Sequence, residues 1–445
     1  MNPRRGKGKD SKNMKRVGII SYPTLFTALL LGLAWAIRGH FGHEWGAAWA
    51  GAIGALALIV ASGRSDWWRA APVLALLGAV GWGAGGMMSY GIVVGYCRGT
   101  DFANVAYGYA MLAVIGGLYG LIGGGMLGLG LETTSQKRPD WAALLAQMLA
   151  LGFLSWGFLI YQLELFMTPP RSELWAGCLG AGLALLWYLH RNGYHAALRV
   201  AVFSCFGAGA GFALGNFFQS LGIASGLAYN WWNVMEFTLG FLGGLGMAYG
   251  VVSSKWPQRA RPAAASNWAA LLLLFLLIPL FNFYAAFSTE KLARLAQNLQ
   301  LQQADAFVHT QQGAGWLLML LFAAGACWLW WQYARQDQQW GWQVPGLLFA
   351  CVLYYTLFGY VVKGVFYQPY SLAQSTTLYL PIVLGAGLWW WWRKTYSLPL
   401  SDEPQAPLRP ATALRLLLLW LLLVAVTAGI TVWGGLGVED AHQRF

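Results

Sequence analysis

The residues best able to do chemistry in this chain are charged or strongly polar side chains that stand inside long apolar runs. Glu236 is the clearest, with Asn233 one helical turn before it on the same face. An ionisable group surrounded by hydrocarbon is costly, so it marks a candidate functional site. A carboxylate at that depth needs a cationic partner, and Arg38 and Lys363 are the candidates. We predict that Glu236 is a substrate ligand or proton carrier; the alternatives are a purely structural buried pair and a position at a water-exposed edge.

The densest polar cluster is the run Arg38-Gly39-His40-Phe41-Gly42-His43-Glu44, in the turn after the first apolar stretch. Two histidines and a carboxylate could bind a transition metal, or could carry protons near neutral pH. The HxxHE spacing matches neither the HExxH nor the HxxEH zinc pattern, so we predict no metal and no cofactor. A proton-carrying or anion-binding role and an ordinary hydrated turn both stay open.

The other polar residues within the runs include amide and hydroxyl side chains. Asn216 lies near the end of one run, and Tyr90 occupies the equivalent position of an earlier run. Under the topology given below, these residues lie in the outer half of the membrane, as Glu236 does. We therefore expect a polar cavity that opens to the outer face. Its candidate substrate-binding or proton-coupling residues are Arg38, His40, His43, Glu44, Tyr90, Asn216, Asn233, Glu236 and Lys363.

The elements that position these side chains are predicted to be transmembrane helices. The chain has 445 residues, of which 58% are hydrophobic and 10% charged, whereas soluble domains are roughly one quarter charged. The apolar residues fall into about thirteen runs of the length needed to cross a bilayer. They cover residues 17–37, 45–62, 70–96, 104–130, 141–163, 174–189, 198–221, 231–253, 267–287, 315–334, 344–366, 375–392 and 412–434. The fold class is thus an all-α polytopic membrane protein.

The distribution of lysine and arginine predicts the orientation of these helices. The formal net charge is +12, but the basic residues lie in short loops between runs and not on one soluble surface, so no nucleic-acid partner is predicted. With a cytoplasmic N-terminus, most of them fall on the inner side, as the positive-inside rule requires. The C-terminus is then outside. Short loops and the absence of a cleavable signal favour a bacterial inner membrane, although a eukaryotic membrane is not excluded.

Similar segments recur along the chain and predict an internal duplication. Trp49-Ala50-Gly51 returns as Trp175-Ala176-Gly177, and Gly83-Ala84-Gly85 returns at the same spacing as Gly209-Ala210-Gly211. An even number of helices in each copy makes the two copies parallel. The predicted units are a basic tail (1–16), two four-helix repeats (17–130 and 131–255), a third, more diverged copy as one interpretation of 256–395, and a linker with a final helix (396–445).

One long outer loop, residues 288–314, has leucines at roughly helical spacing among charged and glutamine residues. This pattern is typical of an amphipathic helix lying on the outer surface. It could cover the cavity or dock a protein partner.

These features favour a transporter for a small polar or anionic solute, with Glu236 or the histidines coupling protons. A second hypothesis is a membrane-embedded enzyme whose outward-facing site acts on a lipid-linked substrate, because histidine and glutamate can exchange protons while arginine holds a phosphate. A third is a noncatalytic subunit of a larger membrane complex. The bilayer and a small-molecule or lipid-linked substrate are the partners that these hypotheses imply.

Overall fold

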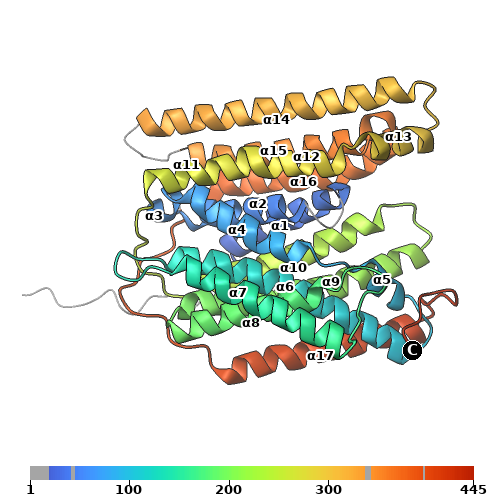
Figure 1. The fold of residues 1–445 in the computed structure, drawn as a ribbon, viewed down its shortest axis with the longest axis horizontal. Coiled ribbons are helices and arrows are strands. Elements are labelled where there is room, and N and C mark those ends of the chain that lie inside the picture. Colours follow the sequence, from blue (N-terminus) through green and yellow to red (C-terminus); the bar gives the residue numbers. More distant parts are fainter. Residues whose placement is uncertain (1–19, 42–45, 336–341, 394–395) are drawn as a thin grey trace, which may run out of the picture.

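A computed structural model describes residues 20–41, 46–335, 342–393 and 396–445, and within these ranges the chain is helical with no strand. The helices run side by side along the long axis of the molecule, with α14 at one edge and α17 at the other (Figure 1). The elements are α1 (Tyr22–Arg38), η1 (Gly39–Phe41), α2 (Gly46–Ser62), α3 (Ser65–Trp68), α4 (Ala71–Gly86), α5 (Gly91–Tyr96), α6 (Phe102–Glu132), α7 (Trp141–Trp156), η2 (Gly157–Gln162), α8 (Leu174–Arg191), α9 (His195–Ala224), α10 (Trp231–Val252), α11 (Ala264–Leu272), η3 (Leu273–Leu277), α12 (Ile278–Ala286), α13 (Thr289–Asn298), α14 (Ala304–Arg335), α15 (Gln343–Val362), η4 (Val365–Tyr367), α16 (Pro369–Arg393) and α17 (Pro410–Trp433).

Many of these helices have the length and composition of membrane spans. In the part of the chain that the structure describes, nine helical segments are long and apolar enough to cross a bilayer. Two more apolar helices, α2 and α4, are shorter. Several such helices in one chain make this an integral membrane protein, because a helix satisfies its own backbone groups in lipid.

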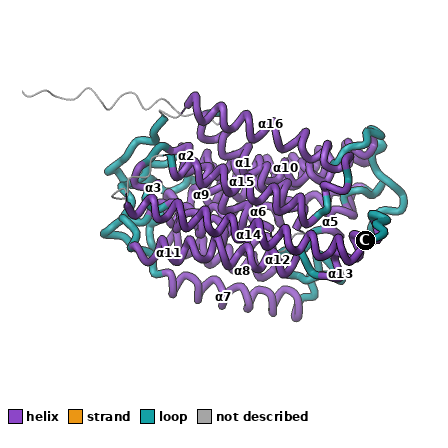
Figure 2. The backbone as a smooth tube through the Cα atoms, turned by 90° about the horizontal axis from the view of Figure 1, so that it is seen from above, coloured by secondary structure: helices purple, strands orange, loops and turns teal. Residues whose placement is uncertain are grey.

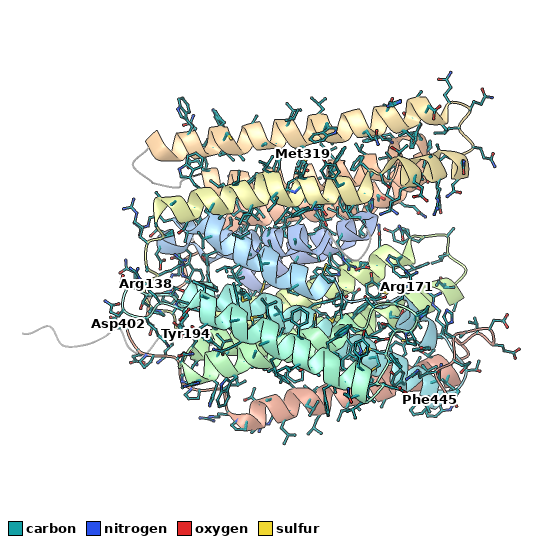
Figure 3. The ribbon with its side chains drawn as sticks, viewed as in Figure 1. Arg138, Arg171, Tyr194, Met319, Asp402 and Phe445 are labelled. Atoms are coloured by element: carbon teal, nitrogen blue, oxygen red, sulfur yellow. The ribbon has the colours of Figure 1, made fainter. Side chains whose placement is uncertain are left out.

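The loops gather at the two ends of the bundle (Figure 2). At one end Arg64 donates to the carbonyl oxygen atoms of Trp256 and Pro257, and Figure 3 places Arg138 and Asp402 at the same end. At the other end the amide of Val438 donates to the carbonyl of Arg98 at 2.8 Å. Loops predicted to share a side of the membrane thus lie together.

A charged network holds the first of these ends together. The Arg64 guanidinium and the Arg259 amide both donate to the Asp66 carboxylate, at 2.5 Å and 2.8 Å. Arg259 also donates from Nε to the carbonyl of Gly130. Burial lowers the pKa of Arg259 to about 10, although the nearby Asp66 charge opposes that shift. These bonds join α3, the end of α6 and the loop after α10, which are distant in sequence.

Small residues set the close spacing of the central helices. A Cβ atom at Gly120 of α6 would lie 2.1 Å from the carbonyl oxygen of Ser204 on α9. One at Gly207 of α9 would lie 2.4 Å from the carbonyl oxygen of Leu242 on α10. Such distances are shorter than any real contact, so backbones meet here because glycine has no side chain.

One pair of residues that correspond in the proposed duplication meets different neighbours. Gly83 of α4 packs on Ala48 of α2, whereas Gly209 of α9 packs on Trp420 of α17 and Ala113 of α6. Gly85 of α4 and Gly211 of α9, by contrast, each pack on the next long helix, at Tyr119 of α6 and at Leu239 of α10. The duplication stays a prediction from the sequence.

The predicted range 70–96 is not one continuous helix. Helix α4 ends at Gly86, and α5 begins only at Gly91. Glycine weakens the last turns of α4 because it has a low helix propensity. The carbonyl groups freed by the break find side-chain donors instead: Arg38 donates to Gly86 and Tyr119 donates to Met88. A run read as a single span thus contains an interruption with polar contacts.

The predicted loop 288–314 does contain a short helix, α13, as the leucine spacing predicts, but the loop is shorter than predicted because α14 already begins at Ala304. Leu292 and Ala296 are buried, whereas Glu290 and Lys291 are exposed. The helix thus lies on the bundle with its apolar side inward. A protein partner for this loop stays a prediction.

Candidate functional site

The interruption between α4 and α5 adjoins a buried ion pair. Arg38, the last residue of α1, donates from Nη1 to Glu236 of α10 at 3.2 Å and 3.4 Å. Both side chains have no solvent exposure. Of the two partners that the sequence offers for Glu236, Arg38 and Lys363, the structure pairs it with Arg38. The predicted functional role of the pair is a separate matter.

Tyr90, which precedes α5, links the two charges. Its hydroxyl accepts a hydrogen bond from Arg38 at 2.8 Å and donates one to Glu236 Oε1 at 2.5 Å. Hydrogen bonds to a charged group are among the strongest in proteins, and a buried pair needs them to offset the cost of leaving water. The three side chains therefore form one connected unit.

Helix ends favour a positive charge at this point. Arg38 stands in the last turn of α1, and its Nη2 lies 3.4 Å from the carbonyl oxygen of Gly86, the last residue of α4. The C-terminal end of a helix carries a partial negative charge, so both α1 and α4 stabilise the guanidinium. Arg38 is thus held by Glu236 and by two helix ends.

Aromatic rings close the space around the guanidinium. Its central carbon lies 5.3 Å from the ring centre of Trp35 and 5.4 Å from that of Tyr90. Phe212 of α9 packs against Tyr90 with ring centres 4.9 Å apart. Rings whose faces are negative attract a cation and exclude water. Any ligand that reaches Arg38 must displace part of this wall.

A second polar chain begins one turn away on α10. Asn233 donates from Nδ2 to the Tyr379 hydroxyl at 3.1 Å, and that hydroxyl lies 3.1 Å from His40 Nε2. His40 Nδ1 lies 3.0 Å from the carbonyl oxygen of Gly359. Because a carbonyl only accepts, Nδ1 carries the hydrogen, and the Tyr379 hydroxyl can donate to Nε2. The pattern is that of a neutral imidazole with every nitrogen partnered.

The remaining predicted residues are not all in this site. Lys363 ends α15 with an exposed side chain, acts electrostatically on His40, and forms no ion pair with Glu236. Asn216 lies on α9 one turn beyond Phe212, away from the ion pair and next to Cys97. His43, Glu44 and the basic tail 1–16 lie outside the described residues.

Two tyrosines that complete the site were not predicted from the sequence. Tyr379 joins Asn233 to His40, and Tyr119 donates to the carbonyl of Met88 inside the interruption. A signal for the first existed, because Tyr379 follows three hydroxyl residues, Ser375 to Thr377, in an otherwise apolar run. Tyr119 stands among the packing glycines of α6, where a tyrosine hydroxyl needs a buried partner.

The grooves on the surface of the bundle differ from this site in chemistry. One of about 430 Å³, between α4 and the pair α7 and α8, is lined by residues such as Met87, Met148 and Trp156. Another of about 320 Å³ lies on the other side of α4, against Ile278 and Phe281. Ala84 and Met87 line both grooves. Apolar grooves thus flank α4 beside its interruption.

Within the described ranges, no three His, Cys, Asp or Glu side chains come together as metal ligands would. Comparisons with protein-family models, with curated proteins and with solved structures found no match.

Proposed function

We propose that this protein transports a small anionic or polar solute across the membrane, with Arg38 as the solute ligand and Glu236 as a proton carrier. The observation that carries the proposal is the placement of Arg38 between a carboxylate and the interrupted helix α4–α5. Interrupted helices form the solute sites of many transporters, because their free backbone groups face the site.

Protonation of Glu236 would couple the two ligands. While Glu236 is ionised, it occupies Arg38 and leaves no net charge for an anion to pair with. A proton on Glu236 removes that competition, and the guanidinium then attracts the solute. The solute and the proton therefore bind together, which is the requirement for coupled transport.

The arrangement of the described residues corresponds to a closed site. Arg38 and Glu236 have no exposure, and Tyr90 has 4%. Opening toward one face requires movement of the segment from Met87 to Tyr90, because Tyr90 covers both charges. Glycines bring the backbones of α4 and α6 together next to this segment, as at Gly81 and Gly123.

We also propose the finer architecture. Helices in each of the ranges predicted from the sequence cross the bilayer, including α2, α4, α8 and α16. The sorting of loops to the two ends supports this alternation. The N-terminus is cytoplasmic, the C-terminus is outside, and the parallel duplication and the bacterial inner membrane remain part of the proposal on sequence grounds.

The test is an uptake assay with purified protein in liposomes, run with and without an inward proton gradient. The solutes are small carboxylates, phosphate and uncharged polar compounds. We expect accumulation of an anion, stimulated by the gradient, and no stimulation in Glu236→Gln. Arg171→Gln is the matched control, because Arg171 is an exposed arginine that takes no part in the network of Arg38, Tyr90 and Glu236. Absence of uptake for every solute class would overturn the proposal.

The apolar grooves favour a second candidate, an enzyme that acts on a lipid-linked substrate. Their volumes, about 430 and 320 Å³, suit lipid chains, and both reach Met87 at the start of the interruption. A head group beside Met87 would approach Arg38 through the interruption. Mass spectrometry of lipids retained by the purified protein separates the two ideas. A turnover-dependent change in a retained lipid head group would favour the enzyme over the transporter.

A further inference from the structure

A second buried polar cluster lies on the outer third of α9, separate from the ion pair. Asn216, Gln219 and Ser220 share one side of this helix, and their exposed fractions are 0%, 3% and 4%. Among the described residues, both polar atoms of the Asn216 amide, Gln219 Oε1 and Ser220 Oγ have no hydrogen-bond partner. Buried polar groups in native proteins are nearly always partnered, so a cluster of unpartnered ones indicates a ligand or ordered water.

The neighbouring hydroxyl groups are already committed to one another. Thr431 of α17 donates to the carbonyl of Thr427 at 2.8 Å, so its oxygen must accept from the Tyr109 hydroxyl, which lies 2.9 Å away. Tyr109 stands next to Ser220. The Tyr109 hydrogen is therefore committed to Thr431, whereas the Ser220 hydroxyl and the Asn216 amide have no hydrogen-bond partner among the described residues.

Arg98, directly after α5, contributes a positive charge. Its Nε is buried without a hydrogen-bond partner, and the side chain forms no ion pair within the described ranges. The residue before it, Cys97, packs on Gly108, the neighbour of Tyr109: a Cβ atom at Gly108 would lie 2.8 Å from both the amide nitrogen and Sγ of Cys97, so Arg98 leaves the chain beside the cluster. The nearby Asp101 carboxylate accepts from the amide of Asn104 at the start of α6. An unpaired, partly buried guanidinium beside two free donors is the chemistry of an anion site.

The segment after α17 covers the turn between α5 and α6 that carries Arg98. Asn104 donates to the carbonyl of His442 at 3.1 Å and accepts from the Arg444 amide at 2.6 Å. The Val438 amide donates to the carbonyl of Arg98 itself. This covering segment therefore bonds to Arg98 through the backbone and leaves its side chain to the cluster.

We propose that Arg98, Asn216 and Ser220 form a second site, for a small oxyanion that also carries a hydroxyl group. The three side chains donate to the negative oxygen atoms, and Gln219 Oε1 accepts from the hydroxyl. Asn216 lies one turn from Phe212, whose ring contacts Tyr90. A transported anion would thus bind at this outer site before it reaches Arg38. Only this order of binding rests on the proposed transport function; the site itself does not.

The test is calorimetric titration of the purified protein with inorganic phosphate at low salt, with sulfate and chloride for comparison. Phosphate carries both charge and hydroxyl near neutral pH, so it should bind more tightly than the other two anions. Arg98→Gln should weaken phosphate binding about tenfold or more, because charge-assisted hydrogen bonds are lost. Ser220→Ala should weaken it less, and Arg171→Gln, which removes an exposed arginine from the same end, should change nothing.

Several results would overturn this assignment. They are an absence of phosphate binding to the wild type, equal binding by Arg98→Gln, and equal weakening by Arg171→Gln. Arg98→Lys guards against misfolding, since it keeps the charge and should bind with intermediate affinity. Arg38→Gln should still bind phosphate at the outer site. If uptake fails while this binding persists, the transport proposal falls and the anion site stands.

Discussion

The strongest prediction concerns the free energy of unfolding when the Arg38–Glu236 pair is broken. Glu236→Gln leaves the guanidinium with no exposure and no counter-charge, although the amide oxygen can still accept from Tyr90. Removing one member of a buried pair costs about 3–5 kcal/mol. The amide keeps hydrogen bonds, so we expect the lower end of that range. Arg38→Met should cost a similar amount, because it strands the carboxylate.

The double variant, Arg38→Met with Glu236→Gln, should be more stable than either single change implies. It removes both charges and keeps an acceptor for Tyr90, so no buried charge is left unpaired. We expect a total cost of about 1–2 kcal/mol, mainly from lost hydrogen bonds, and hence a coupling of about 4–5 kcal/mol. Reversible unfolding in mixed detergent micelles, followed by tryptophan fluorescence, measures all three costs.

Additive costs, agreeing within about 0.5 kcal/mol, would refute the reasoning, because distant and independent sites behave that way. A double variant that recovers stability but transports nothing would separate the two roles of the pair. Stability would then be a consequence of charge balance, and transport would need the charges themselves.

Further predictions concern packing, the outer cluster and a surface ion pair. Gly120→Ala should lower the free energy of unfolding by about 1–3 kcal/mol, because its Cβ would overlap the Ser204 carbonyl. Gly313→Ala, with open space around it, should raise it by up to about 1 kcal/mol. Equal effects of the two variants would contradict the close contact between Gly120 and Ser204. Tyr109→Phe should cost about 1 kcal/mol through the lost bond to Thr431, and Tyr161→Phe, on an exposed side chain, should stay within about 0.5 kcal/mol. Lys255 lowers the pKa of Glu403. The stabilisation by this ion pair should therefore be present above a pH of about 4.3 and fade as the pH falls through the lowered pKa of Glu403. The stability difference between the wild type and Glu403→Gln, measured by thermal denaturation, should therefore shrink as the pH falls. A difference that stays constant down to a pH of about 3, roughly one unit below the ordinary pKa, would contradict this ion pair.

The membrane class and the helix positions follow from the sequence because soluble domains rarely contain apolar runs of bilayer length, and this chain has many. Glycine spacing on α6 and α9 likewise points to close packing, and the contacts of Gly120 and Gly207 are of that kind. A cationic partner for Glu236 was predictable on energetic grounds, since a lone buried charge is too costly, but the choice of Arg38 over Lys363 came only from the structure.

Other features were beyond the sequence because they depend on packing between distant segments. The break after Gly86 lies in a run as apolar as its neighbours, and it persists because Arg38 and Tyr119 satisfy the freed carbonyls. Tyr379 carries no charge to mark it, and its partners Asn233 and His40 lie on other helices. The sequence placed Asn216 in one site with Glu236. In the structure Asn216 lies one turn beyond Phe212, next to Cys97, and belongs to another cluster.

The most direct test of proton coupling at the Arg38–Glu236 pair is the proton count on solute binding. Purified protein in weakly buffered detergent solution, with a pH-sensitive dye, is mixed with the anion found by the uptake assay. We predict uptake of about one proton for each anion bound by the wild type, and none by Glu236→Gln. Anion binding by the wild type with no change in pH would contradict the coupling, because Arg38 would then accept the anion while Glu236 remained ionised.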